Sequence, residues 1–190
     1  MKGFRHLADR QVHKGHIWSV AVATFEAPDG TIFERDIVRS PGAVGAVPLS
    51  FDAEGNPSVV LVRQYRAPYD QFVLEIPAGM RDVADEPTIV TAQRELIEEV
   101  GLRAGHFEPL TEFYPSAGMT DSVLHLFLAT ELTPAAQELH GPEEEHIEIV
   151  HLPLETALAM IDRGEIRDAK TIIGLLMVAR RLATSDAGIV

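Results

Sequence analysis

The stretch Gly79–Leu102 decides the fold, and it reads GMRDVADEPTIVTAQRELIEEVGL. Pro87 suits the first position of a helix and Gly101 suits a C-terminal stop, so the sequence predicts a helix over residues 87–100. Apolar side chains recur along one face of this helix, at Ala92, Leu96 and Val100. A helix with one apolar face can pack on a sheet.

The same helix also carries a cluster of carboxylates. Glu95, Glu98 and Glu99 stand at i, i+3 and i+4, which places all three on one face. Like charges at this spacing repel by roughly a few tenths of a kcal/mol per pair, and Mg²⁺ or Mn²⁺ would remove that repulsion. Arg94 can brace one carboxylate with a charge-assisted hydrogen bond. An acidic face is also typical of a solvated surface helix. The choice between a metal site and such a surface therefore depends on the residues around the helix.

Outward from this helix, short segments rich in β-branched and aromatic residues predict strands. They fall at residues 17–25, 31–38, 43–49, 58–64, 72–76, 107–113, 122–130 and 147–152. Two further helices are predicted at residues 154–163 and 168–182, the second with Asp168 as its N-cap. Strands mixed with a few helices, without a regular βαβ repeat, indicate the α/β (α+β) class, packed as α+β or layered as an α/β/α sandwich.

The first strands form a region of their own. The turn Ala27-Pro28-Asp29-Gly30 joins them in a hairpin that begins a small N-terminal sheet, and Ser40-Pro41-Gly42 suits a boundary. We therefore expect residues 1–40 to form the N-terminal sheet and residues 41–190 the main domain. A two- or three-stranded hairpin is marginal alone and leaves strand edges to pair.

The composition excludes several classes of protein. The chain has 190 residues and no cysteine, which rules out disulfides, a thiol nucleophile and thiolate metal sites. Lys and Arg number 16 against 29 Asp and Glu, a net charge of −13, so nucleic acid is not an expected partner. No apolar run could span a membrane and no secretory signal is found, so we expect a soluble, cytoplasmic protein. A phosphate-bearing substrate would then need positive charge from bound metal.

The helix and its approach resemble the Nudix box, GX5EX7REUXEEXGU, in which U is aliphatic. Gly79 and Glu86 match its first two fixed positions, and the segment from Arg94 to Leu102 matches the remainder. Six residues instead of five separate Gly79 from Glu86, which we interpret as a one-residue insertion in the loop before the helix. So many matching positions are far more specific than the acidic face alone.

Flanking motifs resemble the ADP-ribose pyrophosphatase branch of the Nudix hydrolases. Residues 62–66 read VRQYR and residues 74–79 read LEIPAG, while residues 114–122 read YPSAGMTDS, similar to the SPGxSxE loop of the branch. That loop departs at Ala117, in place of Pro, and at Ser122, in place of Glu. The resemblance implies a Nudix α/β/α sandwich with a mixed sheet, extended by a small N-terminal antiparallel sheet. It also implies hydrolysis of ADP-ribose to AMP and ribose 5-phosphate, and a homodimer with swapped N-terminal strands.

The resemblance further implies a set of site residues. The metal ligands would be the Ala78 backbone carbonyl with Glu95, Glu98 and Glu99, for more than one Mg²⁺ or Mn²⁺ ion. The base would come from Glu143-Glu144-Glu145, with Glu144 favoured over Glu143, and Glu98 is counted with the catalytic group. The substrate contacts would be Arg66 and, less strongly, Arg35 at the diphosphate, Trp18 on adenine, and Met119 near the ribose.

Alternatives stay open on the sequence alone. Arg66 could form only a surface ion pair, Trp18 could be a core or dimer-interface residue, and the glutamate run could be a solvated loop. Relatives with similar motifs hydrolyse GDP-mannose and other nucleotide sugars, and Ser122 weakens the choice of ADP-ribose. A non-catalytic nucleotide-binding regulator is a third reading, although such modules usually lose the box glutamates that this sequence keeps.

Overall fold

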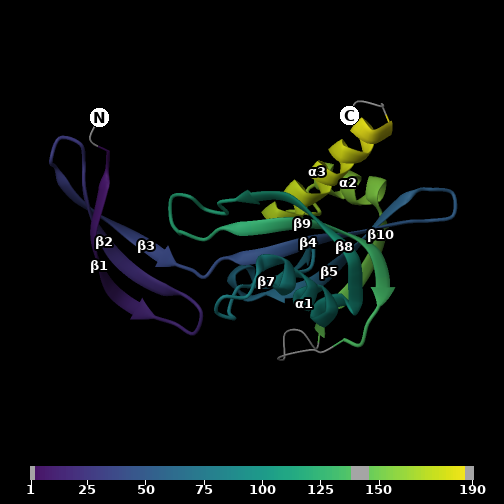
Figure 1. Cartoon of the computed structure of the whole chain (residues 1–190), viewed down its shortest axis with the longest axis horizontal. Coiled ribbons are helices and arrows are strands. Elements are labelled where there is room, and N and C mark those ends of the chain that lie inside the picture. Colours follow the sequence, from purple (N-terminus) through teal and green to yellow (C-terminus); the bar gives the residue numbers. More distant parts are fainter. Residues whose placement is uncertain (1–2, 138–145, 187–190) are drawn as a thin grey trace. The chain divides into compact units, whose positions relative to one another are not determined.

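The computed structural model describes residues 3–137 and 146–186 (Figure 1). The chain forms two compact units. The first comprises Met1–Ala43 with Phe113–Leu124, and the second comprises Val44–Glu112 with His125–Val190. The division at residue 40 into a dimerisation sheet and a catalytic domain stays a prediction.

The first unit is built on a three-stranded antiparallel sheet in the order β1-β2-β3. Its strands are β1 (Arg5–Lys14), β2 (Ser19–Glu26) and β3 (Ile32–Arg39). The predicted turn joins β2 to β3, closed by a hydrogen bond from the Gly30 N–H to the Ala27 carbonyl oxygen (2.9 Å). Strand β1 was not assigned from the sequence, because all its residues are exposed and it lacks the apolar alternation that marks a strand.

The second unit contains a seven-stranded sheet with the main order β10-β5-β4-β9-β8, in which β6 pairs with β5 and β7 with β4. Its strands are β4 (Ala43–Phe51), β5 (Pro57–Arg66), β6 (Gln71–Glu75), β7 (Ala78–Met80), β8 (Leu102–Phe113), β9 (Leu124–Pro134) and β10 (Glu148–Pro153). A 3-10 turn, η1 (Ala67–Tyr69), lies between β5 and β6. Successive residues Val59–Val62 of β5 are all buried, so both faces of this strand are covered.

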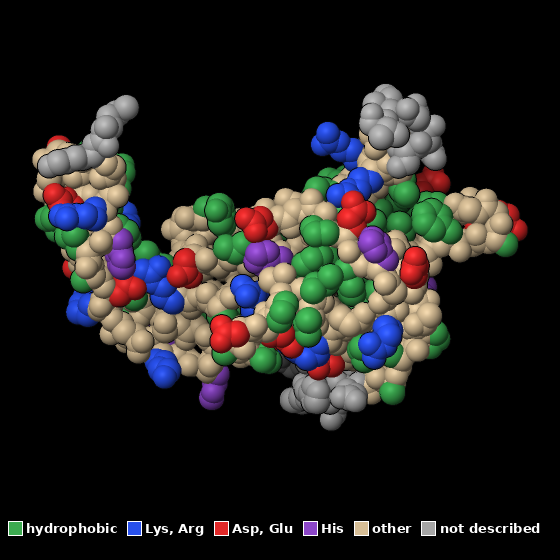
Figure 2. Space-filling model, in the orientation of Figure 1, with side chains coloured by type: hydrophobic (Ala, Val, Ile, Leu, Met, Phe, Trp, Pro, Cys, Tyr) green, Lys and Arg blue, Asp and Glu red, His purple; other side chains and the backbone are tan. Residues whose placement is uncertain are grey.

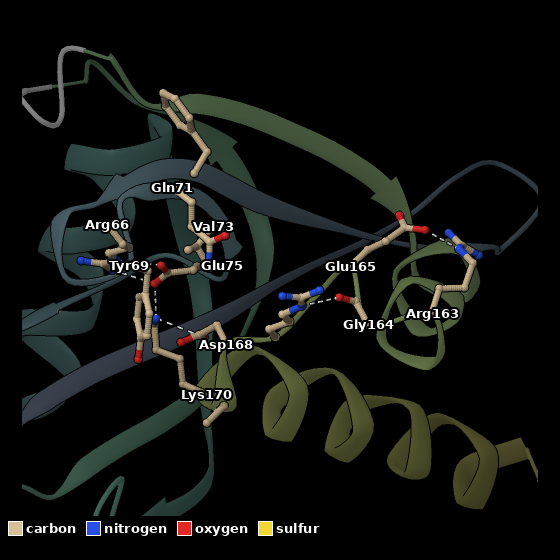
Figure 3. A pocket seen from close by; sticks show the side chains of 13 residues that line it. Arg66, Tyr69, Gln71, Val73, Glu75, Arg163, Gly164, Glu165, Asp168 and Lys170 are labelled. Atoms are coloured by element: carbon tan, nitrogen blue, oxygen red, sulfur yellow. Dashed lines mark hydrogen bonds and ion pairs between the residues drawn. The ribbon is translucent and has the colours of Figure 1, made fainter.

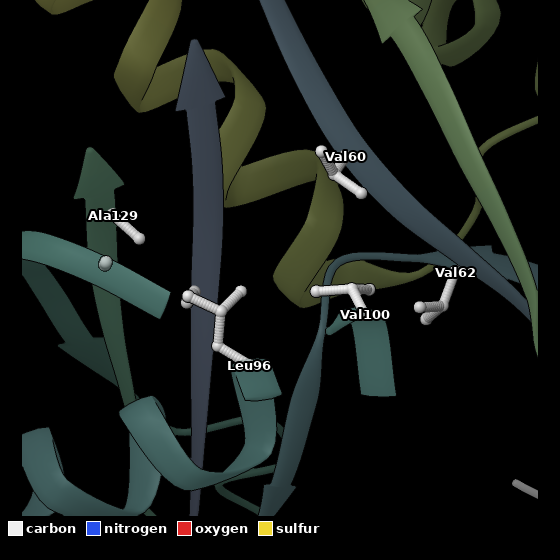
Figure 4. Packing of buried hydrophobic residues seen from close by; sticks show 7 residues of the cluster. Val60, Val62, Leu96, Val100 and Ala129 are labelled. Atoms are coloured by element: carbon white, nitrogen blue, oxygen red, sulfur yellow. The ribbon is translucent and has the colours of Figure 1, made fainter. Parts of the chain in front are cut away.

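Helix α1 (Thr88–Val100) covers one face of the sheet through its apolar side (Figure 4). Its residues Leu96 and Val100 belong to one buried cluster with Val60, Val62 and Ala129 from the sheet. The residues on this apolar side are those that the sequence pattern assigns to it. The carboxylate positions of the helix are therefore fixed relative to the sheet by the packing of Leu96 and Val100.

The ends of α1 differ slightly from expectation. Pro87 is the N-cap and not the first helical residue, because its ψ of 139° is extended. Gly101 ends the helix as predicted, in the left-handed region at φ 63°. Its N–H bonds to the carbonyls of Leu96 and Ile97, which satisfies the last turn.

Helices α2 (Leu154–Asp162) and α3 (Ala169–Asp186) complete the unit. Gly174 of α3 lies so close to β4 that an added Cβ would come within 2.7 Å of Val47 Cγ2. The preceding strand residue, Ala46, packs in the cluster of α1. Because neighbouring residues of a strand point to opposite faces, α1 and α3 cover opposite faces of the sheet, as Figure 1 shows.

The predicted fold class, an α/β/α sandwich with a small N-terminal antiparallel sheet, is confirmed. Every strand and helix assigned from the sequence is present, with ends shifted by a few residues. Strand β7 and turn η1 were not assigned, because each is only three residues long. Over residues 3–137 and 146–186, no helix is long and apolar enough to cross a membrane.

Candidate functional site

The carboxylates of α1 meet β7 where the strand has a glycine. A Cβ added to Gly79 would lie 1.9 Å from the Glu95 carboxyl carbon, so a side chain here would displace this carboxylate. Beside it, the Ala78 backbone N–H donates a hydrogen bond to Glu99 Oε2 (2.9 Å). The structure therefore brings together Ala78, Glu95 and Glu99, three of the residues predicted to bind metal.

Glu99 is held in an environment that opposes its negative charge. It is only 6% exposed, and burial raises the pKa of its carboxyl to about 8. The Ala78 hydrogen bond and the charges of Lys170 and Arg66 favour the carboxylate, whereas the neighbouring Glu95 disfavours it. A buried carboxyl next to another is stabilised by a proton or by a bound cation.

Arg94 is the cation beside these carboxylates. Its Nη1 lies 2.9 Å from Glu95 and 3.0 Å from Glu98, and its Nη2 lies 3.3 Å from Asp82 and 3.5 Å from Glu86. The sequence predicts one braced carboxylate, whereas Arg94 contacts four. The acidic face is therefore a connected network, with several negative charges for one guanidinium.

The extra residue of the Nudix-like box lies in the loop between β7 and α1. Asp85 there takes a left-handed backbone (φ 60°), which non-glycine residues rarely adopt. Glu86 follows it and contacts Arg94, as Asp82 of the same loop also does. This placement favours Glu86, and not Asp85, as the residue that fills the Glu position of the box.

The donor set suits a hard divalent cation, since it consists of carboxylate oxygens. Over the described ranges, 3–137 and 146–186, no three His, Asp or Glu side chains are already arranged to hold one ion. Arg94 contacts Glu95 and Glu98, and the Ala78 N–H contacts Glu99. The residues fit a cation by chemistry and by the burial of Glu99, but binding would have to draw their carboxylates together.

A second charged group lies at the end of β5, in a cavity of about 760 Å³ (Figure 3). Arg66 donates two hydrogen bonds to Glu75, from Nε to Oε1 (2.7 Å) and from Nη2 to Oε2 (2.6 Å). Lys170 contacts the same Oε2 and lies 3.1 Å from Asp168. Burial of Glu75 opposes its charge, but the bonds from Arg66 and Lys170 hold the pKa of its carboxyl below the ordinary value.

The ion pair of Arg66 leaves room for the predicted diphosphate contact. Glu75 is buried, so this is not the surface pair considered as an alternative. A guanidinium has five N–H donors, and the bonds to Glu75 use two of them. The side chain of Arg66 is 38% exposed, so its other donors can reach a ligand.

Glu75 and Lys170 were not identified as site residues from the sequence. The available signal was Glu75 itself, a charge between the apolar residues Leu74 and Ile76 in a predicted buried strand. A buried charge requires a partner. Lys170 stands 95 positions away, and no periodicity links two residues so distant.

The first unit has a cavity of about 400 Å³ that Arg35 and Met119 both line. The Arg35 guanidinium lies 4.9 Å from the centre of the Phe33 ring, and its Nη1 donates to the Glu34 carbonyl oxygen (2.7 Å). Trp18 is 54% exposed and does not line this cavity. Trp18 is therefore not a core residue of this unit. The substrate contacts of Arg35, Met119 and Trp18 stay predictions.

The predicted base residues, Glu143 and Glu144, lie outside the described residues together with Glu145.

Comparison with known proteins identifies the family. A model of the NUDIX domain matches residues 39–174. The chain is 37% identical over 165 residues to an ADP-ribose pyrophosphatase of Bacillus subtilis, covering 87% of this chain and 86% of that protein. It is 38% identical over 136 residues to a GDP-mannose pyrophosphatase of Cronobacter sakazakii, covering 68% and 70%. The chain belongs to the Nudix family.

A solved structure agrees with the fold. The crystal structure of an ADP compounds hydrolase matches with a TM-score of 0.80, covering 100% of this chain and 98% of that one. The two sequences are 22% identical, so this likeness concerns the fold alone.

Proposed function

We propose that this chain hydrolyses the diphosphate bond of ADP-ribose, with water as the nucleophile, to AMP and ribose 5-phosphate. The observation that carries the proposal is the packing of Glu95 and Glu99 against Gly79 and Ala78, in a chain of the Nudix family. The identity to the Bacillus ADP-ribose pyrophosphatase extends over 87% of the chain and supports this substrate.

Each part of the proposed site answers a requirement of the chemistry. A diphosphate diester repels a nucleophile, so the reaction needs positive charge at the phosphoryl group. The residues proposed to hold Mg²⁺ or Mn²⁺, with more than one ion, are Ala78, Glu95, Glu98 and Glu99. Bound metal supplies charge neutralisation and a more acidic water. Arg66 adds a guanidinium whose N–H groups match phosphate oxygens.

The base is proposed to be Glu144, with Glu143 as the second candidate. A base has to lie within hydrogen-bond reach of the attacking water, directly or through another water. Separate Glu→Gln variants at 143, 144 and 145 rank these residues. The base is the position at which turnover falls most while the substrate still binds.

GDP-mannose is the second candidate substrate. The 38% identity to the Cronobacter GDP-mannose pyrophosphatase favours it, although that match covers only 68% of the chain. Both substrates present a diphosphate to the same carboxylates and to Arg66. The choice therefore depends on the groups that contact the two ends of the substrate.

The first unit supports a homodimer as the working form, with swapped N-terminal strands. Several large apolar side chains of this unit are exposed, and their burial against a second copy would remove apolar area from water. They are Phe4, Leu7, Val12, Ile17, Trp18 and Ile32. On the face in Figure 2, Lys and Arg side chains are scattered among acidic and apolar ones, which supports the absence of a nucleic-acid partner. We place the enzyme in the cytoplasm.

A substrate panel tests the proposal. ADP-ribose, GDP-mannose, UDP-glucose, NADH, Ap4A and a nucleoside triphosphate are each incubated with Mg²⁺, Mn²⁺ or EDTA, and the products are separated by chromatography. We expect AMP and ribose 5-phosphate from ADP-ribose, abolished by EDTA. Dominant turnover of GDP-mannose would make GDP-mannose, and not ADP-ribose, the substrate. No turnover of any compound would favour a ligand-binding module.

Glu99→Gln is the matched variant for this panel. Glutamine keeps the shape of the side chain and can still accept the Ala78 hydrogen bond. Loss of a group that merely orients a metal ligand costs about 10–100-fold, so loss of a ligand should lower kcat/KM by more than about 100-fold. Activity within about tenfold of wild type would remove Glu99 from the metal site.

A further inference from the structure

The Glu75 carboxylate is shared by two cations from different parts of the chain. Arg66 reaches it from the end of β5, and Lys170 reaches it from the first turn of α3 (Figure 3). Both contact the same oxygen, Oε2, whereas Oε1 accepts a hydrogen bond from Arg66 Nε. The position and charge of Lys170 therefore act directly on the atom that holds Arg66.

Lys170 is itself fixed by the start of α3. Asp168 lies 3.1 Å from its Nζ and caps the helix, accepting from the Thr171 N–H (2.9 Å) and hydroxyl (2.6 Å). The same hydroxyl accepts a hydrogen bond from the Ile76 N–H (2.8 Å), next to Glu75. The positions of Lys170 and Glu75 are therefore fixed by hydrogen bonds to the backbone as well as by their ion pair.

The charges of this group balance. Arg66 and Lys170 carry two positive charges, and Glu75 and Asp168 carry two negative ones. Without Lys170 the group would be negative by one charge, at the place where the proposed diphosphate has to bind. The Arg66 guanidinium would also be drawn more strongly to Glu75, since no second cation would share that carboxylate.

We propose that Lys170 is a positioning residue that keeps Arg66 available to the diphosphate of the substrate. Its side chain is only 11% exposed, so it acts through Glu75 and not as a main phosphate contact. The inference rests on the proposed function, because it assumes a substrate with a diphosphate. It goes beyond that function by giving α3, far from the metal helix in sequence, a part in substrate affinity.

The test uses Lys170→Met in the full chain, with steady-state kinetics on the substrate that the wild type turns over. A charge-assisted hydrogen bond contributes about a tenfold or greater effect, so KM should rise about tenfold while kcat stays within about twofold. Lys170→Arg keeps the charge and should bring KM back to within about threefold of wild type. Arg63→Met is the matched control, because it removes an exposed cation of β5 and should leave KM unchanged.

Asp168→Asn separates charge from architecture. Asparagine can still cap α3, but the variant leaves the group positive by one charge, so KM should not rise. A purely structural role predicts that Asp168→Asn and Lys170→Met both weaken binding. That result would overturn the proposal, as would an unchanged KM in Lys170→Met. If Lys170→Met does not fold, the changes in KM of Asp168→Asn and Lys170→Arg test the proposal instead. A rise in KM well above about threefold in either variant would overturn it.

A readout without turnover keeps this proposal apart from the proposed function. The Arg66 Nε–H signal in a ¹H–¹⁵N spectrum, assigned with Arg66→Lys, should move in Lys170→Met and stay in place in Arg63→Met. An inactive wild type whose Arg66 signal still responds to Lys170→Met would overturn the proposed function, and with it the role in substrate affinity, while the coupling between the two cations would stand. An Arg66 signal that does not respond to Lys170→Met would overturn the coupling between the two cations.

Discussion

The second unit holds two groups of charged side chains that are built in opposite ways. On α1, Arg94 contacts four carboxylates and Glu99 is buried beside them, so negative charge is in excess. Around Glu75, two cations meet two carboxylates and the charges cancel. Carboxylates in excess are stabilised by a cation from outside, whereas a balanced group is complete as the chain folds.

The difference matches the two tasks of the proposed site. In the proposed function the excess of carboxylates on α1 would attract a divalent cation, which would compete with Arg94 and the Ala78 N–H for these oxygens. The balanced group holds Arg66 in a bidentate pair before any ligand arrives. An arginine held in place in this way loses little side-chain entropy when it binds phosphate.

The largest expected effect comes from breaking the balanced group. Glu75→Gln leaves Arg66 and Lys170 without their shared carboxylate, and removing one partner of a buried ion pair destabilises by about 3–5 kcal/mol. Urea denaturation followed by circular dichroism measures the change in the free energy of unfolding. A loss below about 1 kcal/mol is what an exposed ion pair contributes. The group around Glu75 would then not be a stabilising buried group that differs from the carboxylates of α1.

The pH dependence of stability checks the cause of that loss. The folded pKa of Glu75 is held below its ordinary value of 4.5 by Arg66 and Lys170, against the effect of burial. Its stabilising contribution is therefore present above that value and is lost as the pH falls through the folded pKa. The unfolding free energy of wild type should fall more steeply than that of Glu75→Gln on acidification below about pH 4.5. Parallel curves would contradict this origin.

The two groups also differ in how well the sequence predicts them. The glutamates of α1 share a helix and a 3.6-residue period, and Leu96 and Val100 orient that helix, so the acidic face follows from local spacing. The group around Glu75 joins β5, β6 and α3, and its partners are up to 95 positions apart. Spacing carries no such information, because only the tertiary fold places α3 beside β6.

The remaining departures have equally local reasons. Strand β1 is exposed along its whole length, and its few apolar residues do not alternate regularly, so it lacks the pattern that predicts β2 and β3. The closeness of Gly79 to Glu95 depends on how β7 meets α1, although the glycine itself was visible in the sequence. The pattern of strands and helices predicted the α/β (α+β) class, and the sandwich arrangement was implied by the Nudix resemblance. Neither predicted the contacts between elements.

An intermediate effect on stability is expected when a divalent cation binds the carboxylates of α1. A cation that binds only the folded state at about ten times its Kd adds about 1.4 kcal/mol of stability. For a chain of this size, Mg²⁺ or Mn²⁺ should then raise Tm by about 3–6 °C. Differential scanning calorimetry with and without EDTA measures the shift. In Glu99→Gln the rise in Tm caused by the cation should fall below about 1 °C. Arg63→Met should show the same rise as wild type. An equal rise in both variants would mean that the ion binds elsewhere.

The smallest expected effect lies on the opposite face of β5 from Arg66. Arg63 points away from Glu75 and pairs with Glu148 at 3.5 Å, with side chains 49% and 64% exposed. Water screens such a pair, so Arg63→Met should change the free energy of unfolding by about 0.5 kcal/mol or less. Urea denaturation under the conditions used for Glu75→Gln makes the comparison direct. A loss of unfolding free energy comparable to that of Glu75→Gln would mean that ion pairs of β5 stabilise the fold whether buried or exposed. Burial would then not explain the stability of the group around Glu75.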